Sequence, residues 1–517
     1  MGRNSDSRRW WALGALALSG QAIGLDATVL NVALPTMATS LHAATGQLQW
    51  FIAAYTLVLG ALMIPAGALG DRFGRKKLLL AGLAIFGLAS AACAFATSPG
   101  MLIAARAALG VGGALTLPLS LSMLPVLFAD QAARSRATTI WVTASVVGLP
   151  LGPIIGGWLL DHFWWGSVFL INVPLIVVGA LALALFLPES RSTRRRPADL
   201  PGIALSSAGL TGIIYGFIEA GQSSWGSPAA WVPMAAGAVL LGAFTAWERR
   251  SSHPLIDLAL FTSRDFTIGT ALATLANFAL FGLLFVMPQY FQDIAGASPL
   301  GTGVRLLPMI AGMLAGTRLA PWIIKHTGTR PVIAAGFVLS AAALGLAATT
   351  HVHTGYGFAA VWITLLGAGL ALALPAAMNA AIGALSAERS GSGSGLLQAL
   401  RQVGGTIGVA ILGTVLNTGY RGQLGTSRLP GSLSAAAHSS VTAGVAAGVQ
   451  VARKLNDDTL VQAVRTAFVN GMDRTLIVCG ILTVAGAVVA LLFLPRRSPR
   501  LGPPVADREE SVHEPVG

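Results

Sequence analysis

The chain has 517 residues, of which 54% are hydrophobic and only 10% are charged. This composition is too apolar for a water-soluble domain, so we expect lipid to be the main solvent of the protein. The formal net charge is +13, but the basic residues form short clusters between apolar runs, for example at 71–77 and 194–196, and no contiguous basic face. This pattern argues against a nucleic-acid partner and is typical of the cytoplasmic loops of a membrane protein.

Apolar runs long enough to cross a bilayer recur along the whole chain. A helix needs roughly 20 mostly apolar residues to span the hydrocarbon core. The runs that meet this requirement are 10–34, 48–69, 78–96, 101–128, 138–160, 165–187, 200–220, 229–247, 266–291, 302–324, 331–348, 356–385, 395–416 and 475–494. The sequence therefore predicts an all-α integral membrane protein with fourteen spans.

The distribution of lysine and arginine predicts the orientation of these spans. Both residues gather in cytoplasmic connections, and every second connection, from 35–47 to 349–355, has neither of them. We therefore expect both termini, including the tail at 495–517, to be cytoplasmic. The connection 417–474 lies on the predicted outer side and carries several basic residues. Because long loops largely escape the charge rule, we interpret it as an inserted outer loop, Gly-, Ser- and Ala-rich in its first half and mildly helical in its second.

A weak internal repeat predicts the domain organisation. The connection after the second span contains DRFGR at 71–75, and the connection after the tenth contains KHTGT at 325–329, with the glycine in the same place. Internal repeats are common in secondary transporters. We expect an N-terminal six-helix bundle at 1–187, a linker with two inserted transmembrane helices at 188–265, and a C-terminal six-helix bundle at 266–494 that includes the outer loop.

Two ionisable residues fall inside predicted spans. Asp26 lies well inside the first span and Arg106 about five residues into the fourth, so both belong to the outer leaflet and can interact. Charged groups at this depth are costly and often functional. Burial favours the neutral form of a carboxyl group, which can then take up and release protons. We expect a proton-coupling pair; the alternative is a structural role for each side chain, satisfied by hydrogen bonds.

The fifth span is rich in glycine and proline. Glycines permit close approach of backbones and prolines remove intrahelical hydrogen bonds, so we predict a bent and tightly packed helix. The residues are Gly148, Pro150, Gly152, Pro153, Gly156 and Gly157.

Several stretches of the sequence match one family. They are LDATVLNVALP at 25–35, GALGDRFGRK at 67–76, GLPLGPIIGG at 148–157, FLINVP at 169–174 and the glycine-containing stretch 395–408. Together they resemble the fourteen-helix drug:proton antiporters of the major facilitator superfamily, the EmrB/QacA-like branch, over almost the whole chain. The resemblance implies the major facilitator fold and alternating access, with Asp26 and Arg106 as the coupling pair and the fifth span in the seal between the halves.

The resemblance also implies a conformational lock on the cytoplasmic side. In such proteins Asp71 and Arg75 steady the outward-open state, and Asp130 is positioned to join them. The sequence departs from the family pattern at Leu109, where the fourth-span motif usually has Gln. This departure removes one polar group that supports Arg106 in the family.

Four further polar residues are candidates for lining a pathway, namely Asn31, Glu219, Arg305 and Arg318. Glu219 lies near the outer end of its span, where an ordinary solvated carboxylate explains it equally well. The two arginines can instead extend along the helix to reach the interface.

The sequence predicts a transporter and not an enzyme. It contains no Gly-Lys pair, so the phosphate-binding loop of an ATP motor is absent, and neither HExxH nor GxSxG occurs. Cys93 and Cys479 have no CxxC partner and no His-rich neighbourhood, so we expect no metal site.

The expected activity is efflux of small amphipathic or cationic compounds, such as drugs, antibiotics or dyes, in exchange for protons. We expect a monomer in the cell membrane that needs a proton gradient and no cofactor. The alternatives are a proton-coupled transporter of one metabolite or lipid, and a membrane-embedded enzyme.

Overall fold

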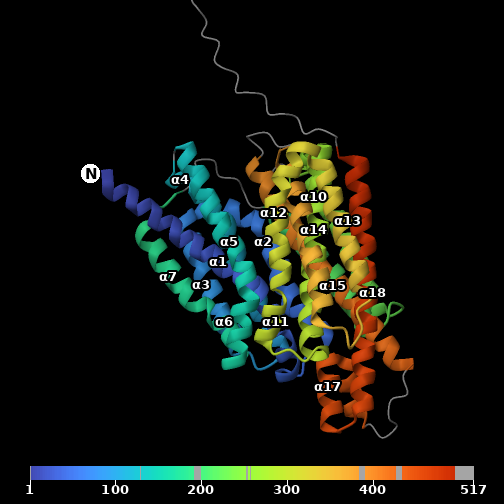
Figure 1. The fold of residues 1–517 in the computed structure, drawn as a ribbon. Coiled ribbons are helices and arrows are strands. Elements are labelled where there is room, and N and C mark those ends of the chain that lie inside the picture. The colour runs from blue at the N-terminus through green and yellow to red at the C-terminus, as the bar shows by residue number, and fades with distance from the viewer. Residues whose placement is uncertain are drawn as a thin grey trace, which may run out of the picture.

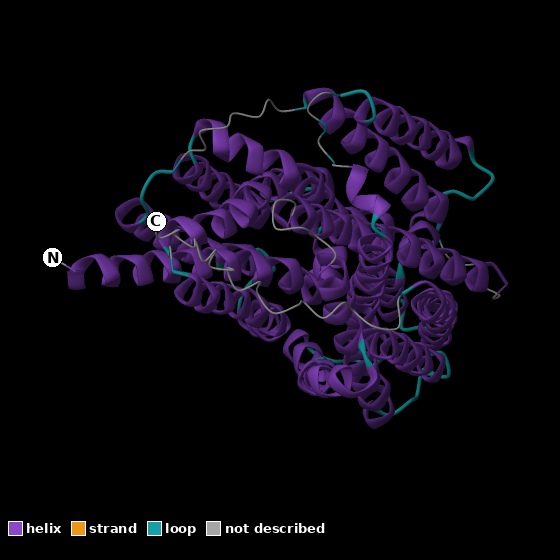
Figure 2. Ribbon diagram, turned by 90° about the horizontal axis from the view of Figure 1, so that it is seen from above, coloured by secondary structure: helices purple, strands orange, loops and turns teal. Residues whose placement is uncertain are grey.

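The structure is a computed structural model, and its architecture is helical throughout the part of the chain that it describes (Figures 1 and 2). The described residues are 2–128, 130–190, 199–251, 254, 256, 258–383, 390–426 and 434–494. For some residues inside helices only the backbone is described.

The helices follow one another with short connections. In chain order they are α1 (Gly2–Ser40), α2 (Thr45–Phe73), α3 (Arg75–Ala94), α4 (Pro99–Leu127), α5 (Gln131–His162), α6 (Ser167–Leu170), α7 (Asn172–Phe186), α8 (Leu200–Gln222), α9 (Pro228–Glu248), η1 (Leu258–Thr262), α10 (Arg264–Gln289), η2 (Tyr290–Ile294), α11 (Pro299–Arg305), α12 (Leu307–Thr327), α13 (Thr329–Ala347), α14 (Tyr356–Gly383), α15 (Ser390–Thr426), α16 (Ala435–Ala443), α17 (Val445–Lys454) and α18 (Asp458–Phe493).

A Ser-Pro pair starts three of the helices. Ser98, Ser227 and Ser298 each accept a backbone hydrogen bond through their hydroxyl oxygen and are followed by a proline at the first helical position. Serine satisfies a free N–H group at the helix start, and proline at this position loses no intrahelical bond. We call the side at which α1 begins the inner side; α4, α9 and α11 all start on the opposite, outer side.

The membrane-spanning series matches the prediction in number. Thirteen helical stretches of the described chain are long and apolar enough to cross a membrane, and α5, which is 32 residues long, supplies the fourteenth. The chain is a multi-pass membrane protein. Two predicted spans are broken: α6 and α7 together form the sixth, and α11 and α12 form the tenth. The sixth breaks before Pro174, whose ring nitrogen cannot donate a hydrogen bond.

The segment 417–474 is more helical than we predicted for an outer loop. α15 continues to Thr426 and α18 already begins at Asp458, with α16 and α17 between them. In Figure 1, α17 projects from the outer side of the molecule. Tyr420 of α15 donates a hydrogen bond to the carbonyl oxygen of Val441 at 2.7 Å and so ties α16 to α15. The Gly-, Ser- and Ala-rich first half favoured a loop and only the second half a weak helix, but packing against α15 and α18 stabilises helices in both.

Two groups of helices lie side by side (Figure 1): α1 to α7 form one, and α10 to α15 with α18 form the other. The inserted pair α8 and α9 pack on each other, and α8 also contacts both α2 and α15. Asn417 of α15 donates a hydrogen bond to the carbonyl oxygen of Gly221 at 2.8 Å, and Thr414 donates one to Phe217. The insert therefore covers the line along which α2 and α15 meet.

The two groups meet along two seams, which we call the α2–α15 seam and the α5–α11 seam. In the first, the Gln49 side chain donates to the carbonyl oxygen of Ala410 at 3.0 Å. In the second, glycines let the backbones of α5 and α11 touch. A Cβ on Gly157 would lie 2.6 Å from the carbonyl oxygen of Pro299, and a Cβ on Gly303 would overlap the carbonyl oxygen of Pro153.

The seams are closed on the outer side. Gln292, just after α10, donates to the carbonyl oxygen of Val32 near the outer end of α1 at 2.8 Å, and Ser298 donates to Asp161 at 3.2 Å. Further hydrogen bonds run along α2 from Thr45 at its outer start, which donates to Ala443 of α16, to Thr56 near its middle, which accepts from Thr406 of α15. The molecule is therefore sealed toward the outer side.

We predict that Gly303→Ala opens this outer seal. The new methyl group meets the backbone of Pro153, and overpacking of this kind costs about 1–3 kcal/mol, here only in the sealed conformation. A cysteine placed at Val32, which is buried beneath the seal, should then react faster with an impermeant maleimide added from outside. Gly345→Ala is the control, because a Cβ there meets nothing within 4 Å; equal labelling in the two variants would contradict the prediction.

Candidate functional site

Asp26 and Arg106 form a buried ion pair in the first helix group. The guanidinium NH1 of Arg106 in α4 donates to Oδ2 of Asp26 in α1 at 2.6 Å. The carboxylate is fully buried and the guanidinium is 1% exposed. Removing one of the two side chains from such a pair strongly destabilises a protein, because the other charge is then buried without an opposite charge. The contact that we expected from the sequence is therefore present.

Arg106 is supported by a backbone carbonyl and by aromatic faces. Its Nε donates to the carbonyl oxygen of Phe51 in α2 at 2.8 Å. The guanidinium carbon lies 4.5 Å from the ring centroid of Tyr55 and 5.9 Å from that of Phe169, distances at which a cation interacts favourably with a ring face. Leu109 is buried and apolar. The polar support that this position usually gives in the family thus comes from other helices.

Asn172 is a third member of the site that we did not single out from the sequence. Its Nδ2 donates to Oδ1 of Asp26 at 3.1 Å and to the hydroxyl of Ser90 at 3.2 Å. The Ser90 hydroxyl donates in turn to the carbonyl oxygen of Phe169. Asn172 begins α7 directly after the break that Pro174 imposes, and this break brings its amide to the carboxylate. The stretch FLINVP was visible, but an uncharged amide in an apolar run gave no sign of its partner.

Three buried polar atoms on the helices that form the site have no partner in the described part of the chain. The hydroxyl of Tyr55, Oδ1 of Asn172 and Oδ1 of Asn31 are buried and accept or donate no hydrogen bond among the described residues. Asn31 is 2% exposed and donates weakly to the carbonyl oxygens of Ala27 and Thr28 in its own helix. Buried polar groups usually have partners, so each of these atoms keeps an unused position for a hydrogen bond.

The glycine-rich helix α5 packs against the site on one face and against the second helix group on another. A Cβ on Gly152 would overlap Thr28, and one on Gly156 would lie 2.7 Å from Val29. Gly157 and the carbonyl of Pro153 face α11. Gly148 and Pro150 fall on a stretch of α5 for which only the backbone is described. The helix therefore connects the turn of α1 after Asp26 with the α5–α11 seam.

The residues expected in a conformational lock lie at the inner ends of α2, α3 and α5. Arg75 donates to the carbonyl oxygen of Ser122 at 3.3 Å. Asp130 caps α5 by accepting a hydrogen bond from the backbone N–H of Ala133 at 2.8 Å. The side chain of Asp71 lies outside the described residues, so its place in the lock stays a prediction.

Glu189 joins this inner loop, and we did not anticipate it. Its Oε1 accepts a hydrogen bond from the backbone N–H of Lys76 at 3.1 Å, and the carboxylate lies over Gly74, which has a positive φ of 109°. Lys76 also donates through its ammonium to the carbonyl oxygen of Ala184 at 2.7 Å. A carboxylate at a helix start is favoured by the helix dipole, so Glu189 acts as the cap of α3 that glycine cannot provide.

The other pathway candidates lie apart from the ion pair. Glu219 is half-buried near the outer end of α8. Arg318 is exposed on α12, beside the exposed Leu319. Arg305 ends α11, and its guanidinium carbon lies 5.6 Å from the ring centroid of Tyr356. None of them contacts Asp26 or Arg106 among the described residues.

A second arginine inside a span was also missed. Arg401 of α15 donates to Oε1 of Gln398 at 2.5 Å, and Asn277 of α10 donates to the Arg401 carbonyl oxygen at 2.7 Å. Its Nε is buried without a partner among the described residues. The signal was the charge itself in the middle of the run 395–416, a stretch that we used only for its glycines. The second helix group thus has an intramembrane cation of its own.

Comparison with known proteins decides the family. The model of the Major Facilitator Superfamily matches residues 16–409. The chain belongs to the major facilitator superfamily. It is therefore a transporter and not an enzyme, as predicted, and its all-α fold is the one expected.

Similar proteins with a stated role are resistance and export proteins. The chain is 34% identical over 469 residues to the methyl viologen resistance protein SmvA of Salmonella typhimurium, covering 89% of this chain and 93% of that protein. It is 33% identical to the tetracenomycin C resistance and export protein of Streptomyces glaucescens, with 94% and 91% covered. It is 35% identical to the multidrug efflux pump LfrA of Mycolicibacterium smegmatis, with 93% and 96% covered.

Solved structures agree on the fold. A bacterial homologue of the human lysosomal transporter Spinster, in an inward-facing and occupied conformation, superposes with a TM-score of 0.68 at 18% identity. The match covers 95% of this chain and 99% of that one.

A substitution series separates the structural role of the ion pair from its chemical role. We predict that Arg106→Met lowers the thermal midpoint strongly, because the Asp26 carboxylate is left buried without its cation at a cost of about 3–5 kcal/mol. Asp26→Leu combined with Arg106→Met should recover most of the midpoint, since apolar replacement of a whole buried pair is often neutral. Fluorescence-monitored unfolding in detergent measures this; a double variant no more stable than Arg106→Met would show that the two side chains are not coupled.

We predict that Glu189→Gln loosens the start of α3. A neutral amide is a weaker acceptor for the Lys76 N–H group, and loss of a helix-start interaction costs about 0.5–2 kcal/mol. Hydrogen exchange should become faster at residues 75–78 and stay unchanged in the membrane core. Glu219→Gln makes the same chemical change elsewhere and should leave this segment as it is. Unaltered exchange at 75–78 in Glu189→Gln would argue against the cap.

Proposed function

We propose that the protein exports small amphipathic compounds, among them drugs, antibiotics or dyes, by exchanging them for protons through alternating access. The observation that carries this proposal is the buried pair of Asp26 and Arg106, an ionisable site at membrane depth. The names of the similar proteins support the substrate class, because they refer to resistance to methyl viologen, to resistance to and export of tetracenomycin C, and to efflux of multiple drugs.

Protonation of Asp26 is the proposed coupling step. With the carboxylate ionised, Arg106 donates a charge-assisted hydrogen bond to it, which is about twice as strong as a neutral one. A proton that reaches Asp26 removes this interaction and leaves Arg106 with the Phe51 carbonyl and the Tyr55 ring. The bonds that hold α1 to α4 and α7 then weaken together, because Asn172 also donates to the same carboxylate.

Movement of α1 reaches the seams directly. Val29 of α1 packs on Gly156 of α5, and the Val32 carbonyl accepts the bond from Gln292. We propose that the closed outer seam with the ion pair formed corresponds to the state after proton release to the inner side, ready to take substrate from the cytoplasm. Substrate then moves the molecule to the outward-open state, where protonation of Asp26 favours the return.

The remaining assignments complete the proposal. The inner side is the cytoplasm, both termini lie there, and the protein works as a monomer without a cofactor. On that side Asp71, Arg75 and Asp130 form the lock that steadies the outward-open state. Asn31 lines the route next to the ion pair, and Glu219 and Arg318 remain candidates at its margins.

We predict that Asp26→Asn abolishes proton-driven transport. An amide occupies the same space but carries no proton that is exchanged near neutrality. Everted membrane vesicles that contain the wild-type protein and are energised by a proton gradient should accumulate a dye such as ethidium in their interior. With Asp26→Asn the rate should fall to that of vesicles without the protein, at an equal amount of inserted protein.

The matched control is Asp458→Asn, which removes an exposed carboxylate at the outer start of α18 and should transport normally. A panel of cationic, neutral and anionic compounds in the same vesicles defines the substrate range. Full gradient-driven efflux by Asp26→Asn would falsify the coupling role, and a single transported metabolite would favour the narrower alternative.

A further inference from the structure

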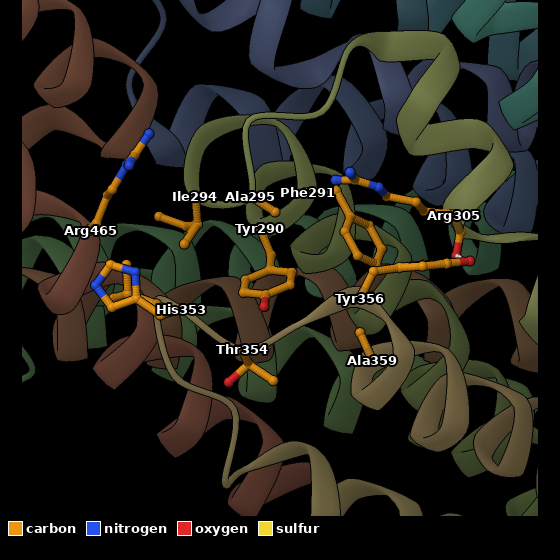
Figure 3. A pocket seen from close by; sticks show the side chains of 11 residues that line it. Tyr290, Phe291, Ile294, Ala295, Arg305, His353, Thr354, Tyr356, Ala359 and Arg465 are labelled. Atoms are coloured by element: carbon orange, nitrogen blue, oxygen red, sulfur yellow. Dashed lines mark hydrogen bonds between the residues drawn. The ribbon is translucent and has the colours of Figure 1, made fainter.

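A cavity lies at the outer end of the second helix group, away from the ion pair. Its volume is about 250 Å³, several times the roughly 30 Å³ that a water molecule occupies in the liquid. Its walls come from the end of α10 with η2, the end of α11, the connection before α14, and the start of α18 (Figure 3). It is thus built only from elements of the C-terminal half.

Cations approach this cavity from two sides. Both Arg305 and Arg465 line it, and Figure 3 shows them on opposite sides, with Tyr290, Phe291 and Ile294 between them. No hydrogen bond or ion pair of either guanidinium to a described residue exists, and Nε of Arg465 is buried without a partner. Two guanidinium groups facing one cavity repel each other unless an anion lies between them.

Acidic groups nearby do not neutralise the two arginines. Asp293 of η2 lies near enough to both Arg453 and Arg465 for an electrostatic interaction, so one carboxyl group faces two cations. Asp473 interacts electrostatically with Tyr290 but does not line the cavity. His353 in the cavity wall supplies a further hydrogen-bonding ring. The cavity therefore keeps an excess of donors and positive charge.

The surroundings of the cavity are those of the membrane–water interface. Tyr356 is 40% exposed and lies beside Arg305, and tyrosine is enriched at the level of lipid headgroups. Val304 and Val361, on the helices that form the wall, are about half exposed. A molecule held by the arginines can therefore place an apolar chain along these residues.

We propose that this cavity binds a phosphate group, which Arg305 and Arg465 grip from two sides. Guanidinium groups suit phosphate because their N–H groups form two parallel hydrogen bonds to its oxygens. The exposed apolar residues on α11 and α14 favour a phospholipid of the outer leaflet as the source, with free phosphate as the other source of the same chemistry. This site does not depend on the proposed drug export.

The site touches the outer seal through α11. Arg305 follows Gly303, the residue whose backbone meets Pro153 of α5, by two positions. A ligand on Arg305 fixes the end of α11, so it stabilises the sealed conformation by mass action on that state.

Lipid binding to the purified full-length protein tests the proposal. We expect phosphatidylglycerol added to the detergent-solubilised protein to raise its thermal midpoint and to be retained in native mass spectra. Arg305→Gln with Arg465→Gln should weaken the apparent affinity roughly tenfold or more, the effect of losing charge-assisted bonds. Lys454→Gln removes one exposed positive charge on the same outer side and should bind as the wild type does.

Competition with inorganic phosphate distinguishes the two sources. Displacement of the lipid only by other phospholipids supports the headgroup, and equal binding of inorganic phosphate, lost in the double variant, supports the free anion. Arg465→Lys should bind with intermediate affinity, because a lysine keeps the charge but not the paired donors. Equal lipid and phosphate binding by the wild type and by the double variant, or no binding by either, would overturn the proposal.

Discussion

A carboxylate and a guanidinium that are both removed from water can remain charged only as long as they stay together. Asp26 and Arg106 meet this condition with a 2.6 Å bond, and the carbonyl of Phe51, the amide of Asn172 and the ring of Tyr55 complete their shells. These partners come from α1, α2, α4 and α7, so one charge state holds four helices of the first group in register. A change in the charge of Asp26 therefore alters the contacts of all four helices.

In the proposed mechanism, the seams translate such a change into a difference between the two sides of the membrane. α1 lies between the ion pair and α5, and α5 reaches α11 through contacts of backbone on backbone. Contacts of this kind have no side chain that can adapt, so a small shift either preserves or breaks them. The chemistry inside one helix group and the closure between the groups are thereby linked through a single pair of packed helices.

The sequence carried the spans and the ion pair because both follow from the cost of polar groups in lipid. A span needs roughly 20 apolar residues to cross the bilayer, and a charged side chain inside a span needs an opposite charge beside it. Asp26 and Arg106 were therefore identifiable without a structure. Asn172 was not identifiable, because an uncharged amide does not require an opposite charge and its position depends on the break before Pro174. Glu189 lies in a loop whose return to Gly74 is a tertiary event. The helices between 417 and 474 form because of packing, which composition does not encode.

The covering of the two seams is unequal. α8 lies over the α2–α15 seam, whereas in the contacts of the described chain no further helix packs across the lipid side of the α5–α11 seam. A hydrophobic molecule dissolved in the bilayer therefore meets the additional helix α8 at one edge of the protein and the directly packed helices α5 and α11 at the other. If export begins by lateral entry from the membrane, the uncovered α5–α11 edge is therefore the side on which we expect it, and the two inserted helices make the two edges of the molecule unequal.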